Sequence, residues 1–149
     1  MDLYLPFKHL HSGWRYLVLA LLLLAIINAF YGWLGKGKYS GASRKLNLFT
    51  LISAHLQFVF GLVLYFLSPK VRTDDMGMAM KDAISRYWTV EHAIMMLLAI
   101  VLITIGHSKS KKALVGTVKH RNIAIFYTLA LIIIIAAISM SGLPILMMS

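Results

Sequence analysis

The chain has 149 residues, of which 60% are hydrophobic and only 13% charged, and its mean hydropathy is +0.78. This composition excludes an ordinary soluble globular domain and is typical of a protein embedded in a lipid bilayer. Because the chain has no cysteine, disulfides, thiolate metal sites, cysteine nucleophiles and thioether-linked haem are excluded. The net charge of +10 indicates basic loops that set membrane topology and contact anionic lipid, rather than binding to nucleic acid.

The first predicted transmembrane helix covers residues 13–34. Its apolar run begins at Trp14 and is longer than the apolar core of a signal peptide, which has about 7–15 residues. No small-x-small cleavage pattern follows it, so we expect a retained helix. His11 lies at the outer edge of this helix, after the interfacial His9, and Arg15 lies four residues after His11 on the same helical face.

The second predicted helix covers residues 46–67. It follows the connector GKGKYSGASRK, which contains four cations and no acidic residue. His55 lies ten residues beyond Lys45, which corresponds to about 15 Å along a helix. His55 is therefore predicted near the middle of the membrane.

The third predicted helix covers residues 84–106 and contains Glu91 and His92. It follows the connector SPKVRTDDMGMAMKDAISR, which mixes both charge signs and within which residues 76–86 are predicted as a short interfacial helix. His92 lies 17 residues before Lys109, or about 25 Å from the basic end of the span, in the outer half of the membrane. Ionisable residues at such a depth are rare, face the interior of a bundle and usually mark a functional site.

The fourth predicted helix covers residues 123–146. The connector before it, HSKSKKALVGTVKHR, contains five cations and no acidic residue. His107 and His120 flank this basic segment, and both are predicted to be solvated surface histidines.

The charges of the connectors predict how the chain crosses the membrane. The positive-inside rule places the two basic connectors in the cytoplasm and therefore both termini and the mixed connector outside. The aromatic residues Tyr65, Tyr87 and Trp88 are predicted at the outer interface. The predicted fold class is all-α: a polytopic up-down four-helix bundle that forms a single transmembrane domain over residues 1–149.

Neutral imidazoles inside an apolar four-helix bundle are suited to the ligation of haem b. A bis-histidine haem needs two axial imidazoles, an apolar slot and partners for its propionates. His92 is predicted as one ligand, with His55 or His11 as the other, and the adjacency of the second and third helices slightly favours His55. Arg15 and Arg86 are the predicted propionate partners. The alternative for these histidines is simple packing, with each ring hydrogen-bonded to a neighbouring helix.

Glu91 does not share a face with His92, because consecutive helical residues point about 100° apart. A ligand role beside His92 is therefore not expected. We predict that Glu91 accepts a ring N–H from another helix or forms a salt bridge with Arg15 or Arg86, and a role in proton transfer during quinol oxidation is a further option.

The chain resembles the small four-helix bacterial membrane proteins known as "cytochrome B". The residues that carry the resemblance are HSGWRYLVL, KLNLFTLISAHLQFVFGLVLYFLSP, RYWTVEHAIMMLLAIVLITIGHSKSKK and RNIAIFYTLAL, which together span most of the sequence. The resemblance implies a b-type haem, electron transfer and a place in the bacterial inner membrane. On this sequence the matching histidines are His11, His55 and His92.

Two other functions remain open at the level of sequence. Copper handling is suggested by Met76, Met78 and Met80 on the outer side, with Met147 and Met148 expected there too, because thioethers and imidazoles bind Cu(I). A structural subunit is the other alternative. No HExxH motif is present, so an electron-transfer protein is favoured over a stand-alone enzyme. Expected partners are membrane lipid, a quinol or redox protein, and a homo-oligomer or larger complex.

Overall fold

The part of the chain that the structure describes, residues 3–67 and 75–141 of a computed structural model, is built from helices without strands. In chain order they are α1 (Tyr4–Leu34), α2 (Gly41–Leu67), α3 (Met76–Lys81), α4 (Ala83–Arg86), the π-helix η1 (Tyr87–Glu91), α5 (His92–Lys112) and α6 (Gly116–Met140). Four stretches are long and apolar enough to cross a membrane: α1, α2, the continuous run of α4, η1 and α5, and α6. The chain is therefore a multi-pass membrane protein, as predicted.

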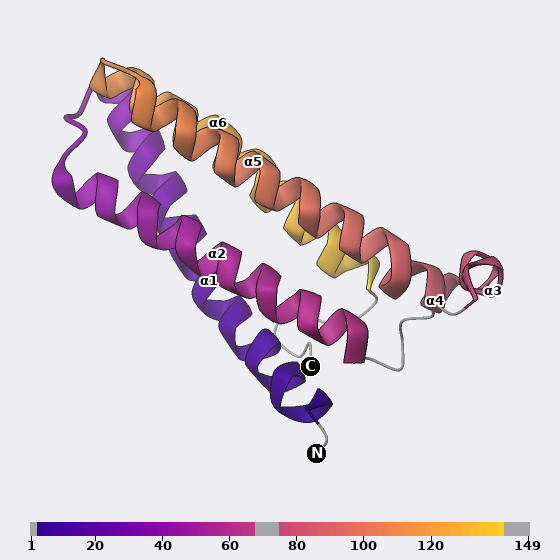
Figure 1. The fold of residues 1–149 in the computed structure, drawn as a ribbon. Coiled ribbons are helices and arrows are strands. Elements are labelled where there is room, and N and C mark those ends of the chain that lie inside the picture. The colour runs from indigo at the N-terminus through magenta and orange to yellow at the C-terminus, as the bar shows by residue number, and fades with distance from the viewer. Residues whose placement is uncertain (1–2, 68–74, 142–149) are drawn as a thin grey trace.

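The four long helices form the predicted up-down bundle (Figure 1). α1 packs along both α2 and α6, and α5 packs along α6, whereas α2 and α5 touch far less. The start of α1, the end of α2, the start of α5 and the end of α6 meet at one end of the bundle, where all four line one cavity. The two short basic connectors lie at the opposite end, which the positive-inside rule assigns to the cytoplasm.

The helices extend beyond the apolar segments in several places. α1 begins at Tyr4 and not at residue 13, so His9 and His11 lie within the helix and not before it. The segment 76–86 forms two short helices instead of one, because Asp82 ends α3 in an extended conformation and then caps α4 by accepting from the Ser85 backbone N–H. The predicted fourth span ran to residue 146, and its part beyond residue 141 lies outside the described residues, as do Met147 and Met148.

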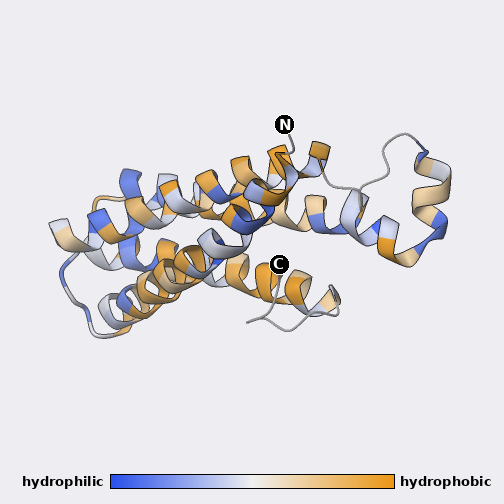
Figure 2. Ribbon diagram, turned by 90° about the horizontal axis from the view of Figure 1, so that it is seen from below, coloured by the Kyte–Doolittle hydropathy of each residue, from blue (hydrophilic) through white to orange (hydrophobic). Residues whose placement is uncertain are grey.

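Small residues allow the helices to approach closely around the bundle axis. Ala25, Ala29, Ala124 and Ala130 are fully buried, and a Cβ added at Gly106 would lie 2.5 Å from Cβ of Phe126. Lipid gives helices little hydrophobic reason to associate, so close packing of this kind stabilises the bundle. Figure 2 shows the complementary pattern, with hydrophilic residues gathered at the basic end and around α3.

Polar contacts also tie α1 to α2. The indole of Trp14 donates to the Ser53 carbonyl at 2.9 Å, and the Gln57 amide donates to the His11 carbonyl at 2.8 Å. Each interhelical hydrogen bond in a membrane contributes about 0.6 kcal/mol on average. Their main consequence is therefore register: they set which residues of the two helices lie opposite one another.

His120 corrects one sequence-based expectation, because it is buried instead of solvated. Its side chain is only 1% exposed, and its Nε2 lies 3.1 Å from the Lys38 carbonyl oxygen. A Cβ added at Gly32 would lie 2.3 Å from this ring, so glycine is what makes room for it. The prediction failed because α6 begins at Gly116, before the apolar segment, and its first turns already face α1.

Candidate functional site

A cavity of about 270 Å³ lies at the end of the bundle opposite the basic connectors. It opens where α2 and α5 fail to pack tightly, and its wall is almost entirely apolar, with Phe58, Met96 and Ile134 among its residues. The polar or ionisable side chains in the wall are those of His11, Arg15, Gln57, Tyr65 and His92. An apolar cavity with a few convergent polar groups is the usual form of a cofactor or ligand site.

His11 and His92 both line this cavity, and their rings lie close to each other in an edge-on arrangement. Their ring centroids are 6.5 Å apart and their planes are inclined at 66°. His11 lies near the start of α1 and His92 begins α5, so the two rings come from helices that are diagonal in the bundle. They meet because the weak contact between α2 and α5 leaves the centre of this end open.

His55 does not join them. Its Nδ1 lies 2.8 Å from the Leu51 carbonyl oxygen, and its Nε2 lies 3.3 Å from Oγ1 of Thr104. Thr104 is twelve residues after His92, or about 18 Å further along the same run of helix. The structure therefore does not form the His55–His92 pair that the sequence slightly favoured. His55 instead makes the interhelical contact expected of a packing histidine.

The π-helix η1 immediately before His92 is the feature that the sequence did not indicate. The backbone N–H of His92 donates to the Tyr87 carbonyl, five residues earlier, in place of the usual four. Tyr87 thereby contacts the His92 ring at a centroid distance of 5.7 Å, and Trp88, about one regular helical turn before His92, contacts it at 5.3 Å. Single π turns in long helices occur often at functional sites, because the extra residue changes which side chains face inward.

The hydroxyls of Tyr87 and Tyr65, both predicted at the outer interface, are hydrogen-bonded inside the bundle. Tyr87 is only 5% exposed, and its hydroxyl donates to the Ala137 carbonyl of α6. The Tyr65 hydroxyl donates to the Thr89 carbonyl of η1 at 2.7 Å, and its side chain lines the cavity. These two bonds hold the π turn between α2 and α6 and so keep His92 in place.

Arg15 and Gln57 place polar groups inside the cavity wall. Arg15 is 7% exposed and lines the cavity, in agreement with the predicted face that it shares with His11. Gln57 is held by its bond to the His11 carbonyl, while its Oε1 is buried without a hydrogen-bond partner among the described residues. Sequence reasoning overlooked Gln57, although a polar amide within an apolar span was a usable signal.

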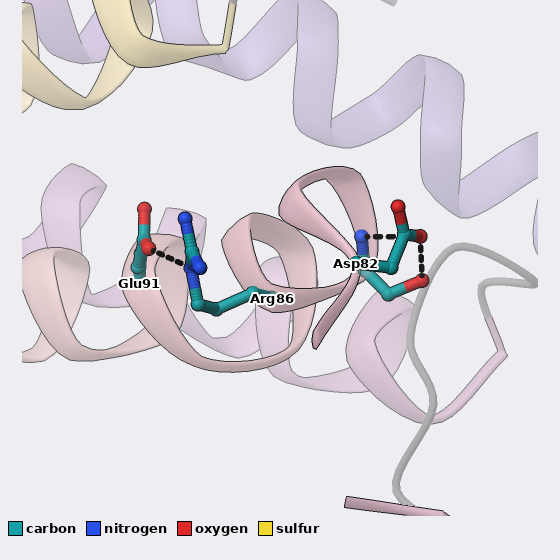
Figure 3. A network of polar contacts seen from close by, with 4 residues as sticks. Asp82, Arg86 and Glu91 are labelled. Carbon is teal, nitrogen blue, oxygen red and sulfur yellow. Dashed lines mark hydrogen bonds and ion pairs between the residues drawn. The ribbon is translucent and has the colours of Figure 1, made fainter. Parts of the chain in front are cut away.

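Glu91 is paired with Arg86, one of the two partners predicted for it. The Nε of Arg86 lies 2.7 Å from Oε1 of Glu91, and the two side chains are 41% and 30% exposed (Figure 3). This ion pair explains how an acidic residue is tolerated next to the membrane interior. Arg86 is not among the cavity residues, so only Arg15 of the two predicted propionate partners reaches the site.

The donor set suits a haem better than a protein-only metal site. Among the described residues there is no group of three or more His, Asp or Glu side chains that would hold a metal ion. A haem iron needs only two axial ligands from the protein. Two imidazoles that bind one metal from opposite sides through nitrogens at roughly 2 Å would have ring centroids about 6 to 6.5 Å apart, and those of His11 and His92 are 6.5 Å apart.

The methionines proposed for copper are arranged less favourably. Met76, Met78 and Met80 are about half exposed on α3. Residues two apart on a helix point about 160° away from each other, so Met78 faces away from the other two. Methionines at alternate positions would share one face of a β-strand, but on the helix α3 they point in different directions.

Comparisons with protein-family models, curated proteins and solved structures find no match to this chain.

Proposed function

We propose that this protein is a membrane b-type cytochrome in which His11 and His92 are the two axial ligands of one haem. The observation that carries the proposal is the pair of imidazoles with ring centroids 6.5 Å apart in the wall of an apolar cavity, within four helices long enough to span a membrane. The haem would supply one-electron transfer. The location that we propose, the bacterial inner membrane, follows from the sequence resemblance to the small four-helix "cytochrome B" proteins, for which the comparisons found no match.

The residues of the chain have separate tasks in this proposal. His11 and His92 would bind the iron, and Arg15 would pair with a propionate carboxylate. Gly61 leaves room beside His11, because a Cβ there would lie 3.0 Å from Nε2 of His11. The apolar wall would exclude water, which together with the axial ligands sets the potential of the haem.

The exposed edge of the cavity suggests how electrons would enter. Leu62 of α2 and Leu97 of α5 line the cavity, yet they are 48% and 50% exposed and therefore face lipid. A quinol dissolved in the bilayer or a partner membrane subunit would approach at this edge. We propose electron exchange with such a partner rather than a stand-alone enzymatic reaction.

Absorbance spectroscopy of the detergent-purified protein, expressed with an ample haem supply, tests the proposal. We expect a reduced-minus-oxidised difference spectrum of a bis-histidine b-type haem. His11→Ala and His92→Ala should each abolish it, whereas the matched controls His55→Ala and His107→Ala should keep it. Haem retained in His92→Ala, or a colourless wild-type protein, would refute the proposal.

Metal analysis of the same samples separates the alternatives. Copper at one equivalent, lost when Met76, Met78 and Met80 are replaced together by leucine, would favour copper handling. A protein with neither haem nor copper, in which His92→Ala lowers only the melting temperature, would identify a structural subunit with packing histidines.

A further inference from the structure

The hydroxyl of Tyr87 is placed to control which nitrogen of His92 carries the proton. A tyrosine hydroxyl has one hydrogen to donate, and a backbone carbonyl only accepts. In this structure the Tyr87 hydroxyl donates to the Ala137 carbonyl of α6. Tyr87 is 5% exposed and Ala137 is fully buried, so the side chain is held away from the lipid. The hydrogen of Tyr87 is therefore committed to α6.

The oxygen of the same hydroxyl faces the imidazole. Oη of Tyr87 lies 3.4 Å from Nδ1 of His92, a contact somewhat longer than the roughly 3.2 Å upper limit typical of N–H···O hydrogen bonds. Because its hydrogen is already donated, this oxygen approaches Nδ1 only as an acceptor. A hydrogen bond between the two atoms then requires the hydrogen to lie on His92, which favours protonation of Nδ1.

The π turn is what brings the two side chains together. In a regular α-helix, residues five apart point about 140° away from each other and do not touch. In η1 the backbone N–H of His92 bonds to the carbonyl of Tyr87, so the two residues are stacked along the helix instead. Their ring centroids are 5.7 Å apart, with Trp88 against the same imidazole.

We propose that Tyr87 is a positioning residue that holds neutral His92 as the Nδ1–H tautomer and leaves Nε2 as its electron-pair donor. A neutral imidazole ligates a metal through the nitrogen that lacks the proton, and a hydrogen bond from the other nitrogen sets its orientation and raises its basicity. The ligand role of His92 rests on the proposed function. The tautomer is a property of the chain by itself and is measurable without haem.

Nitrogen NMR of the haem-free protein in detergent or lipid tests the tautomer directly. The protein is labelled with ring-¹⁵N histidine, and the signals of His92 are identified by their loss in His92→Gln. We expect a protonated Nδ1 and a bare Nε2 for His92 in the wild-type protein. A His92 that is protonated on Nε2 would overturn the inference, and this measurement needs no variant of Tyr87.

Tyr87→Phe supplies the second measurement, with Trp88→Phe as the matched control that keeps the hydroxyl. Loss of the acceptor should move His92 toward the Nε2–H tautomer, while the control should keep the wild-type tautomer. Unchanged His92 signals in folded Tyr87→Phe would also overturn the inference. A merely structural role for Tyr87 predicts a lower melting temperature without a change of tautomer.

These experiments distinguish a failure of the proposed function from a failure of the role proposed for Tyr87. If the protein binds no haem but His92 is the Nδ1–H tautomer, the proposed function falls and the role of Tyr87 stands. If haem is bound, Tyr87→Phe should shift its midpoint potential to a more positive value, because a less basic imidazole stabilises the oxidised iron less. A bound haem with an unchanged potential and an Nε2–H tautomer would leave the proposed function intact and remove the role of Tyr87.

Discussion

Four histidines of the spanning helices have three different environments, and these environments separate the proposed ligands from packing residues. His11 and His92 face a cavity, His55 bonds to Leu51 and Thr104, and His120 is enclosed against Gly32. A metal ligand needs a nitrogen that the protein has not already used, together with space beside it. Only the first pair combines an adjacent cavity with a second imidazole at a suitable distance.

Filling the space beside His11 should remove the cofactor without unfolding the protein. Gly61→Leu places a side chain where even a Cβ would lie 3.0 Å from Nε2 of His11. We expect loss of the haem spectrum with helical content retained in circular dichroism. Gly13→Leu is the control, because a Cβ at Gly13 meets nothing within 4 Å. Full haem occupancy in Gly61→Leu would show that the haem does not use this part of the cavity.

The inner end of the bundle has its own close contact, between Gly32 and His120. Gly32→Ala should destabilise the protein by about 1–3 kcal/mol, the usual range for overpacking a core, because its Cβ would lie 2.3 Å from the ring. The double variant Gly32→Ala/His120→Ala should regain part of the lost melting temperature. If the double variant lost as much melting temperature as the two single variants added together, a direct contact would be contradicted. The haem spectrum should be unaffected throughout.

At the scale of elements, the π-helix decides the site. The extra residue of η1 turns Tyr87 toward His92, and it also lets Arg86 reach Glu91 five positions later. Tyr65 and Tyr87 anchor this turn to α2 and α6 through hydrogen bonds to backbone carbonyls. One irregular turn thus provides Glu91 with an ion-pair partner and positions His92, the predicted ligand.

Removing one residue from η1 should uncouple these features. Deletion of Val90 converts the π turn to a regular α-helix and rotates the preceding residues by about 100° relative to His92. We expect helical content to persist, while haem binding and the Nδ1–H tautomer of His92 are lost. Val90→Ala, which keeps the residue count, should behave as the wild type. A deletion variant with a normal spectrum would show that η1 is dispensable.

The two arginines predicted near the site should now differ in their effects. Arg86→Gln breaks an ion pair whose members are 41% and 30% exposed, so it should cost less than about 1 kcal/mol and leave haem in place. Arg15→Gln removes the cation inside the cavity and should weaken haem retention during purification. Titration of the haem-free variants with haemin, followed by absorbance, compares the two affinities. Equal losses in both variants would argue against a specific role for Arg15.

At the scale of the whole molecule, the helices share their contacts unequally. α1 and α6 form the packed centre, whereas α2 and α5 approach each other only loosely. That uneven packing creates the cavity and leaves its edge toward lipid at Leu62 and Leu97. The same bundle keeps its basic connectors at one end and the cavity at the other.

The absence of native cysteine allows a direct test of orientation. Leu114→Cys lies in the second basic connector at a position that is 97% exposed, and Gly77→Cys lies on exposed α3 at the other end. With intact bacterial cells, a membrane-impermeant thiol reagent applied outside the inner membrane should label Gly77→Cys but not Leu114→Cys. Both should react after detergent lysis, which controls for reactivity. Labelling of Leu114→Cys in intact cells would invert the predicted topology.

Much of the architecture was predictable from the sequence because the bilayer imposes it. A spanning helix needs about 20 apolar residues, and unpaired backbone is excluded from lipid, so four apolar runs predict four helices. The charges of the connectors predict which ends lie together. The presence of His92 and Glu91 in a span was enough to mark the site and to suggest Arg86 as a partner.

The pairing of histidines was decided only by the tertiary structure. Depth along a helix follows from the rise per residue, but it contains no information on how each helix is rotated or how far it stands from its neighbours. His55 and His92 lie on helices that are adjacent in the chain, yet the loose contact of α2 with α5 and the rotation of each helix leave them apart. His11 and His92 lie on diagonal helices, yet the open centre of the bundle and the extra residue of η1 bring them together. Both features arise from packing between helices and from a backbone irregularity, and neither leaves a periodic trace in the sequence.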